Sequence, residues 1–173
     1  MGRNKALLPY GGSTLVEHVA HVVRDAAGSV ALIGDPARLG HLGLTVIPDE
    51  LPGCGPASGI YTALRVTQTD WNLIVACDMP SVTSEVLRDL LGAAATSERD
   101  CVAASGPGCA PEPLCGVYHR RSLPALERAM RDKRLRMRDL VAEIGAELRP
   151  VSAAALANVN TPGEWEEFEA KPS

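Results

Sequence analysis

Short apolar runs alternate with helical patterns along most of the chain. The clearest run, residues 73–77, has no polar position before Asp78 and Pro80. An apolar run of this length without alternation is typical of a strand buried on both faces, as in a parallel α/β sheet. Asp78 then lies at the carboxyl end of this strand, the edge at which open α/β sheets bind ligands. A simple turn or helix cap also suits this position, and the stretch alone does not decide between the two.

The remaining pattern predicts one α/β domain spanning residues 1–173. Apolar residues at helical spacing, with cap signals in front, predict helices over residues 15–26, 56–67, 83–95, 122–130 and 136–144. Strands are expected at residues 29–33, 44–47, 100–104 and 147–151, and residues 114–119 suit an antiparallel strand at the sheet edge. Strands that alternate with helices indicate a three-layer α/β/α sandwich with a mostly parallel, Rossmann-like sheet.

Composition and charge exclude several classes of protein. A net charge of −4 and a pI near 5.6 argue against a nucleic-acid binder. The five cysteines are odd in number and form no CxxC pair, so neither a zinc site nor a disulfide framework is indicated. Without a signal peptide or a membrane-spanning apolar segment, the expected location is the cytoplasm.

Several polar features follow predicted strands and should share one rim of the sheet: Asp49, the loop at residues 53–59, Asp78 and residues 158–161. The loop is rich in glycine and opens a helix, so its backbone N–H groups suit an anion. It lacks the spacing of a P-loop, and a plain turn is the simpler interpretation. For Lys5 a solvated terminal lysine is the simpler interpretation, and for the basic cluster at 131–138 a solvated helix face is.

Five segments, taken in order, resemble the successive motifs of the molybdenum cofactor guanylyltransferase family. They cover nearly the whole chain: Gly-Arg-Asn-Lys-Ala-Leu-Leu-Pro at 2–9, Gly-Pro-Ala-Ser-Gly-Ile at 55–60, Cys-Asp-Met-Pro at 77–80, Glu-Pro-Leu-Cys-Gly-Val-Tyr at 112–118 and Asn-Val-Asn-Thr-Pro at 158–162. The resemblance implies a fold of the nucleotide-diphospho-sugar transferase type. It also implies Mg²⁺-dependent transfer of GMP from GTP to the terminal phosphate of molybdopterin, with release of pyrophosphate.

The resemblance also implies roles for individual residues. Asp78 would hold Mg²⁺, and Lys5 would neutralise the triphosphate, so these two are the candidate catalytic residues. The nucleotide would contact Lys5, Asp78, Asp49, Gly55, Pro56 and Gly59, with the Asp49 carboxylate accepting from the N1 and N2 edge of guanine. Asn158 and Asn160 would face the pterin, whose edge mixes donors and acceptors. Arg134 and Arg136 are our own candidates for its phosphate.

The family begins with a strand and a glycine-rich loop ahead of the segment that matches Met1. We therefore expect a start upstream, a trimmed chain or an impaired protein, and favour the first two because the other motifs look intact. A molybdopterin cytidylyltransferase, or a nucleotidyltransferase for another phosphorylated acceptor, remains an alternative. So does a non-catalytic paralogue that binds nucleotide, pterin or a partner. Molybdoenzyme apoproteins or other cofactor-biosynthesis proteins are the expected partners.

Overall fold

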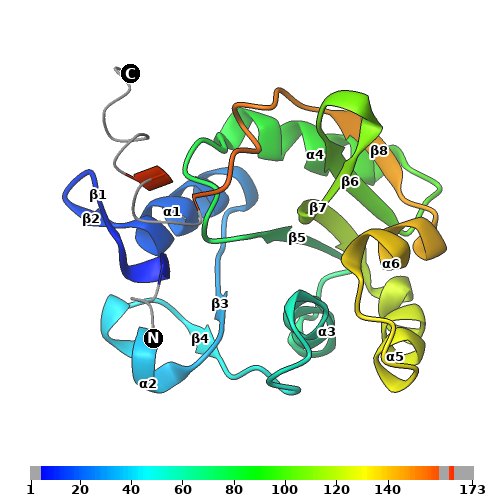
Figure 1. Cartoon of the computed structure of the whole chain (residues 1–173), viewed down its shortest axis with the longest axis horizontal. Coiled ribbons are helices and arrows are strands. Elements are labelled where there is room, and N and C mark those ends of the chain that lie inside the picture. The colour runs from blue at the N-terminus through cyan, green and yellow to red at the C-terminus, as the bar shows by residue number, and fades with distance from the viewer. Residues whose placement is uncertain (1–4, 160–163, 166–173) are drawn as a thin grey trace.

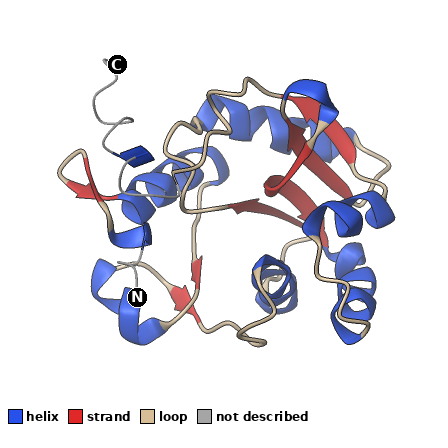
Figure 2. Ribbon diagram, in the orientation of Figure 1, coloured by secondary structure: helices blue, strands red, loops and turns tan. Residues whose placement is uncertain are grey.

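The computed structural model describes residues 5–159 and 164–165, with the Lys5 side chain left out. Helices cover both faces of a twisted sheet, so the predicted α/β sandwich is confirmed (Figures 1 and 2). The helices are α1 (Leu15–Ala27), α2 (Pro36–Leu39), α3 (Pro56–Val66), α4 (Ser84–Thr96), α5 (Leu123–Arg131) and α6 (Met137–Ile144). Short 3₁₀ turns occupy Lys5–Leu7, Gly40–Leu42, Pro107–Cys109 and Arg120–Ser122.

The main sheet has the strand order β5-β7-β6-β8, from β5 (Trp71–Val75), β7 (Pro111–His119), β6 (Cys101–Ser105) and β8 (Glu147–Pro150). β7 runs antiparallel to both of its neighbours, whereas β6 and β8 are parallel, so β5, β6 and β8 share one direction. The expectation of an antiparallel strand over residues 114–119 is correct in direction but wrong in place. β7 lies inside the sheet and starts at Pro111, because it returns between two parallel strands instead of adding to an edge.

Two small sheets precede the main sheet. β1 (Pro9–Tyr10) and β2 (Ser13–Thr14) form an antiparallel hairpin, and β3 (Leu32–Ile33) pairs in parallel with β4 (Val46–Ile47). The strands predicted at 29–33 and 44–47 are therefore shorter than expected, with the same carboxyl ends. Those ends lead into Gly34-Asp35 and Pro48-Asp49, where the pairing stops.

Capping signals set the helix ends as the sequence predicts. Thr14 and Glu17 form a reciprocal capping box at the start of α1, and Gly28 ends this helix in the left-handed conformation. Pro56 is the first residue of α3, where its missing N–H has no helical partner to lose. Thr83 caps α4 by accepting from the backbone of Val86 at 3.4 Å.

The core lies on both faces of the main sheet, and β6 shows why. Its side chains alternate, with Cys101 and Ala103 packed against α3, α5 and α6, and Val102 and Ala104 packed against α4. A Cβ at Gly116 would lie 2.9 Å from the Val102 carbonyl oxygen, so the close approach of β7 and β6 requires glycine there. β6 is thus a strand buried on both faces.

β5 differs from the prediction made for it. Every residue from Trp71 to Val75 is only partly buried, although Ile74 packs on the side of α3 and Leu73 and Val75 pack on the side of α4. In the described part of the chain β5 pairs with β7 alone, so no strand covers its other edge.

Among the helices of the described ranges, none is both long and apolar enough to cross a membrane.

Candidate functional site

Asp78 lies in the turn that follows β5 and is half-buried. Among the described residues, none donates a hydrogen bond to its carboxylate, and α4 is capped by Thr83 instead. The turn is held through its main chain, because the Pro80 carbonyl oxygen lies 3.1 Å from Nε2 of the His18 side chain on α1. Asp78 therefore does not act as a helix cap, and its carboxylate oxygens remain available to a ligand.

A distant segment is joined to this turn. The Val159 N–H donates to the Asp78 carbonyl oxygen at 2.9 Å. The Val159 side chain is 2% exposed and packs in a cluster with Leu15, Val19 and Trp165. This anchor holds the neighbouring Asn158, which is exposed, beside Asp78. Asn160, the second expected pterin residue, lies outside the described residues.

The glycine-rich loop and Asp49 meet at the start of α3. Gly55, at the N-cap of the helix, has φ 66° and ψ −157°, a conformation that only glycine adopts without strain. The Asp49 carboxylate is half-buried and accepts from Ser58, from Thr62 Oγ1 at 3.2 Å and from the Leu51 N–H at 3.1 Å. At Gly59 an added Cβ would meet no atom within 4 Å, so this face of the helix is open.

α3 also connects this group to the main sheet. Its Ile60 is fully buried in the cluster against which Ile74 of β5 packs. Asp49, Gly55, Pro56 and Gly59 thus form one group on α3 and the loop before it, while Asp78 and Asn158 form a second group at the end of β5. In the described ranges, no hydrogen bond or ion pair joins the two groups directly.

Lys5 is described only through its backbone, which begins the 3₁₀ turn Lys5–Leu7. The end of this segment is fixed against α1, because the Leu15 N–H donates to the Leu8 carbonyl oxygen at 2.9 Å. The position of the amine lies outside the described atoms, so its expected contact with a triphosphate stays a prediction.

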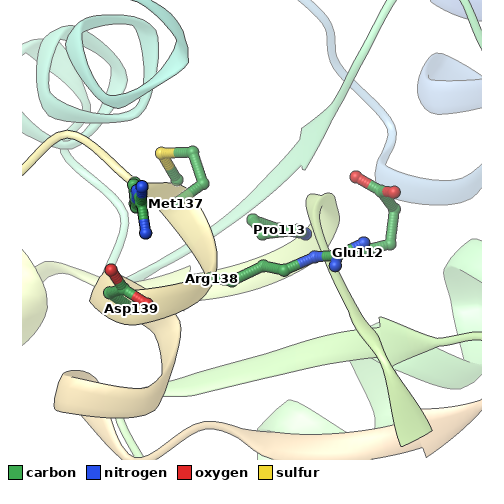
Figure 3. Close-up of a pocket in the computed structure, with 6 residues that line it drawn as sticks. Glu112, Pro113, Met137, Arg138 and Asp139 are labelled. Atoms are coloured by element: carbon green, nitrogen blue, oxygen red, sulfur yellow. The ribbon is translucent and has the colours of Figure 1, made fainter. Parts of the chain in front are cut away.

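A pocket of about 480 Å³ opens between the start of β7 and the start of α6 (Figure 3). Its lining residues are Glu112, Pro113, Arg136, Met137, Arg138 and Asp139. Arg138 extends from α6 toward Glu112 and Pro113 in Figure 3. The Ala76 N–H donates to the Leu114 carbonyl oxygen at 2.7 Å, which puts this end of β7 next to the segment that leads to Asp78. The pocket therefore opens at the same edge of the sheet as the Asp78 turn.

The two arginines expected at the pterin phosphate have different surroundings. Arg136 lines the pocket, whereas Arg134 pairs with Glu143 at 2.5 Å and with Asp132 at 3.4 Å. The hydrogen bond from Arg134 lowers the pKa of Glu143, and the same bond raises the pKa of Arg134. Glu112 and Arg138 had no role in the sequence interpretation, although Glu112 belongs to one of the five motifs. No local pattern indicates that residues so far apart in the chain share a pocket.

Within the described ranges, no three His, Cys, Asp or Glu side chains gather closely enough to hold a metal ion by themselves. Mg²⁺ does not need such a cage, because it usually binds one or two carboxylates together with water and substrate phosphates. The carboxylate of Asp78, which receives no described hydrogen bond, fits a Mg²⁺ ion that binds together with a triphosphate.

Comparison with known proteins gives a consistent result. Residues 1–151 match the family model of the MobA-like NTP transferase domain. A probable molybdenum cofactor guanylyltransferase from Carboxydothermus hydrogenoformans is 34% identical over 97% of this chain and 88% of its own length. One from Pelotomaculum thermopropionicum is 33% identical over 95% of this chain and 83% of its own.

Solved structures confirm the fold. The crystal structure of molybdopterin-guanine dinucleotide biosynthesis protein A from Archaeoglobus fulgidus has a TM-score of 0.80 and 23% identity, over 97% of this chain and 90% of that one. The family match covers most of the sequence, and the relatives align over nearly all of it. This chain therefore belongs to the family of MobA-like NTP transferase domains.

Proposed function

We propose that this protein transfers GMP from GTP to the terminal phosphate of molybdopterin. One observation carries the proposal: the turn of Asp78 is bonded to Val159 in a chain whose relatives are named molybdenum cofactor guanylyltransferases. Two of the five motifs, the carboxylate at residues 77–80 and the amide segment beginning at residue 158, are thereby brought together. The names of the relatives favour GTP over CTP as the donor.

The reaction joins two anions. An oxygen of the molybdopterin phosphate attacks the α-phosphorus of GTP, and a new P–O bond forms. The bond from that phosphorus to the oxygen bridging the α- and β-phosphates breaks, and pyrophosphate leaves with the electron pair. Because the protein makes no covalent bond in this scheme, catalysis consists of holding the two substrates in line and neutralising their charge.

Asp78 and Lys5 carry the charge-handling roles in the proposal. Asp78 would hold Mg²⁺, which when bound neutralises charge on the phosphate oxygens. The free carboxylate of Asp78 supports this role, since no described donor competes for its oxygens. Lys5 would supply a compact positive charge to the triphosphate. Its place at the start of the chain segment packed on α1 is compatible with that role.

The start of α3 suits the nucleotide. Gly55 and Pro56 open the helix, and the positive end of the helix dipole favours a negatively charged or acceptor group there. The open face at Gly59 allows a ligand to approach the helix backbone closely. Asp49 would accept hydrogen bonds from the N1 and N2 edge of guanine, while the acceptors of cytosine would be repelled.

The other side of the rim suits the acceptor. Asn158 and Asn160 would donate to and accept from the pterin edge. Arg136, in the pocket next to this segment, would bind the pterin phosphate. Arg134 would do so only by giving up its pairing with Glu143 and Asp132, so it is the weaker of the two candidates. Transfer of the product to molybdoenzyme apoproteins or other cofactor-biosynthesis proteins is the expected next step.

The test is release of pyrophosphate from GTP and molybdopterin in the presence of Mg²⁺. We expect release to require all three components and to be much faster with GTP than with CTP. Faster release with CTP would assign the protein to cytidylyl transfer. Release that needs no molybdopterin, but another phosphorylated acceptor, would keep the reaction class and reject the acceptor.

A further inference from the structure

The two carboxylate oxygens of Asp49 have different surroundings. Oδ1 accepts from the hydroxyl of Ser58, from Thr62 Oγ1 at 3.2 Å and from the Leu51 N–H at 3.1 Å. In the part of the chain that the structure describes, no hydrogen bond reaches Oδ2. One oxygen of this carboxylate is therefore fully engaged by the protein, and the other is left for a ligand.

Ser58 and Thr62 act from one face of α3. They are four residues apart, so their side chains lie one turn apart on the same side of the helix. Both residues are 0% exposed, although both carry a polar hydroxyl. A buried hydroxyl without a partner is destabilising, so these two residues need the bonds that they make. We call this pair the Ser58–Thr62 clamp.

Thr62 connects the clamp to the backbone as well. Its Oγ1 accepts from the Glu50 N–H at 3.0 Å and donates to Asp49 Oδ1 at 3.2 Å. The same hydroxyl thus fixes the main chain after Asp49 and the carboxylate itself. Neither the Asp49 side chain nor the main chain that follows it can turn without breaking bonds to buried hydroxyls.

We propose that Ser58 and Thr62 are positioning residues that set the nucleotide specificity of the protein by holding Asp49 with Oδ2 directed at the guanine base. This inference rests on the proposed function, in which Asp49 recognises the base. A carboxylate that turned freely would bind guanine with an entropy cost, and a hydroxyl-bonded one has already lost that freedom. The clamp therefore acts through Asp49 on binding of the nucleotide and not on the reacting phosphates.

The experiment measures the dissociation constants of GTP and CTP by calorimetry, together with pyrophosphate release, for the full chain and three variants. Ser58→Ala and Thr62→Val each delete one hydroxyl at nearly constant volume, and Thr62→Ser retains it. We expect the first two to weaken GTP binding about tenfold, with little change in CTP binding, kcat or the KM of molybdopterin. Thr62→Ser should behave like the unaltered protein.

A double-mutant cycle with Asp49→Asn separates positioning from general loosening of α3. If the clamp acts through Asp49, adding Ser58→Ala to Asp49→Asn should cause little further loss of GTP affinity. Equal losses with and without Asp49 would overturn the inference. So would unchanged GTP binding in Ser58→Ala and Thr62→Val.

The two hypotheses fail in different ways. A protein that binds GTP with the expected dependence on the clamp but releases no pyrophosphate would overturn the proposed function and keep the inference. Normal turnover with a GTP preference that does not depend on Ser58 or Thr62 would keep the proposed function and overturn the inference. Absence of GTP binding by the unaltered chain would overturn both.

Discussion

Asp49 and Asp78 are both half-buried carboxylates that follow a strand, but the protein holds them in opposite ways. Asp49 is fixed by its side chain, through hydroxyls and an N–H that occupy one of its oxygens. Asp78 is fixed through its main chain, by the bond from Val159, and its carboxylate receives no donor from the described residues. The difference suits the two ligands that we propose: an oriented oxygen for a base at Asp49, and oxygens without a described hydrogen bond for a metal ion at Asp78.

The largest expected effect comes from removing the charge of Asp78. Asp78→Asn should lower turnover by at least about 100-fold, because the carboxylate would hold the Mg²⁺ ion that neutralises charge on the reacting phosphates. Its stability should change little, since no described donor loses a partner. The matched control is Asp35→Asn, because the Asp35 carboxylate caps α2 by accepting from the Ala37 N–H at 2.9 Å.

Turnover and urea unfolding of both variants check this contrast. Asp35→Asn should keep both its turnover and its stability, because asparagine caps a helix about as well as aspartate. If Asp78→Asn unfolded instead, with turnover of the surviving protein unchanged, Asp78 would be a structural residue and the comparison would collapse.

A second test concerns two glycines of α3, the helix that holds Asp49. Gly55→Ala should lower the free energy of unfolding by about 1–3 kcal/mol, because alanine is strained at φ 66° and ψ −157°. Gly59→Ala is the matched control within the same helix. It should raise the free energy of unfolding by roughly 0.5–1 kcal/mol, since a helical glycine is replaced in open space.

Kinetics of the same two variants then report on the ligand. If the nucleotide lies against α3, Gly59→Ala should raise the KM of GTP in spite of its higher stability. An unchanged KM would remove Gly59 from the nucleotide site and leave Asp49 as the main contact on this side.

The last test concerns the main sheet, whose strand β5 leads to Asp78. Burial raises the pKa of Cys101 and of Cys115 from 9.0 to about 12. The unfolded chain loses these thiol protons near pH 9 and the folded chain keeps them, so stability should fall as the pH rises from 9 toward 12. At pH 10 the loss should be about 1 kcal/mol for each cysteine.

Urea unfolding at pH 8 and pH 10 measures this loss. Replacing Cys101 and Cys115 by alanine should reduce the difference between the two pH values, whatever the cost in packing at pH 8. Replacing the exposed Cys109 should leave the difference unchanged. An equal fall in all variants would mean that other groups cause it.

Local signals predicted much of this fold, and long-range pairing accounts for the errors. The capping box of Thr14 and Glu17, Pro56 at the start of α3 and Gly145 after α6 all use interactions within a few residues, and these boundaries were correct. The place of β7 and the partial exposure of β5 depend on which strands pair, which the apolar pattern of one strand does not encode.

The candidate site divides in the same way. Asp49 and Asp78 follow β4 and β5, and Gly55 and Pro56 lie at the start of α3, where the pattern placed them. The bond from Val159 to Asp78 and the clamp on Asp49 were not predicted, because each depends on contacts across the fold. Ser58 belongs to the motif at residues 55–60. Only its burial beside Asp49 in the structure indicates the positioning role that we propose for it.

The bond between Val159 and Asp78 also has a consequence for synthesis of the protein. The two residues are about eighty positions apart, so at roughly 5–20 residues per second the ribosome makes Asp78 several seconds before Val159. During that interval the turn after β5 lacks its bond from residue 159, and Asn158 has not been made. A nascent chain can therefore assemble the start of α3, with the Ser58–Thr62 clamp, well before it can bring an amide beside Asp78.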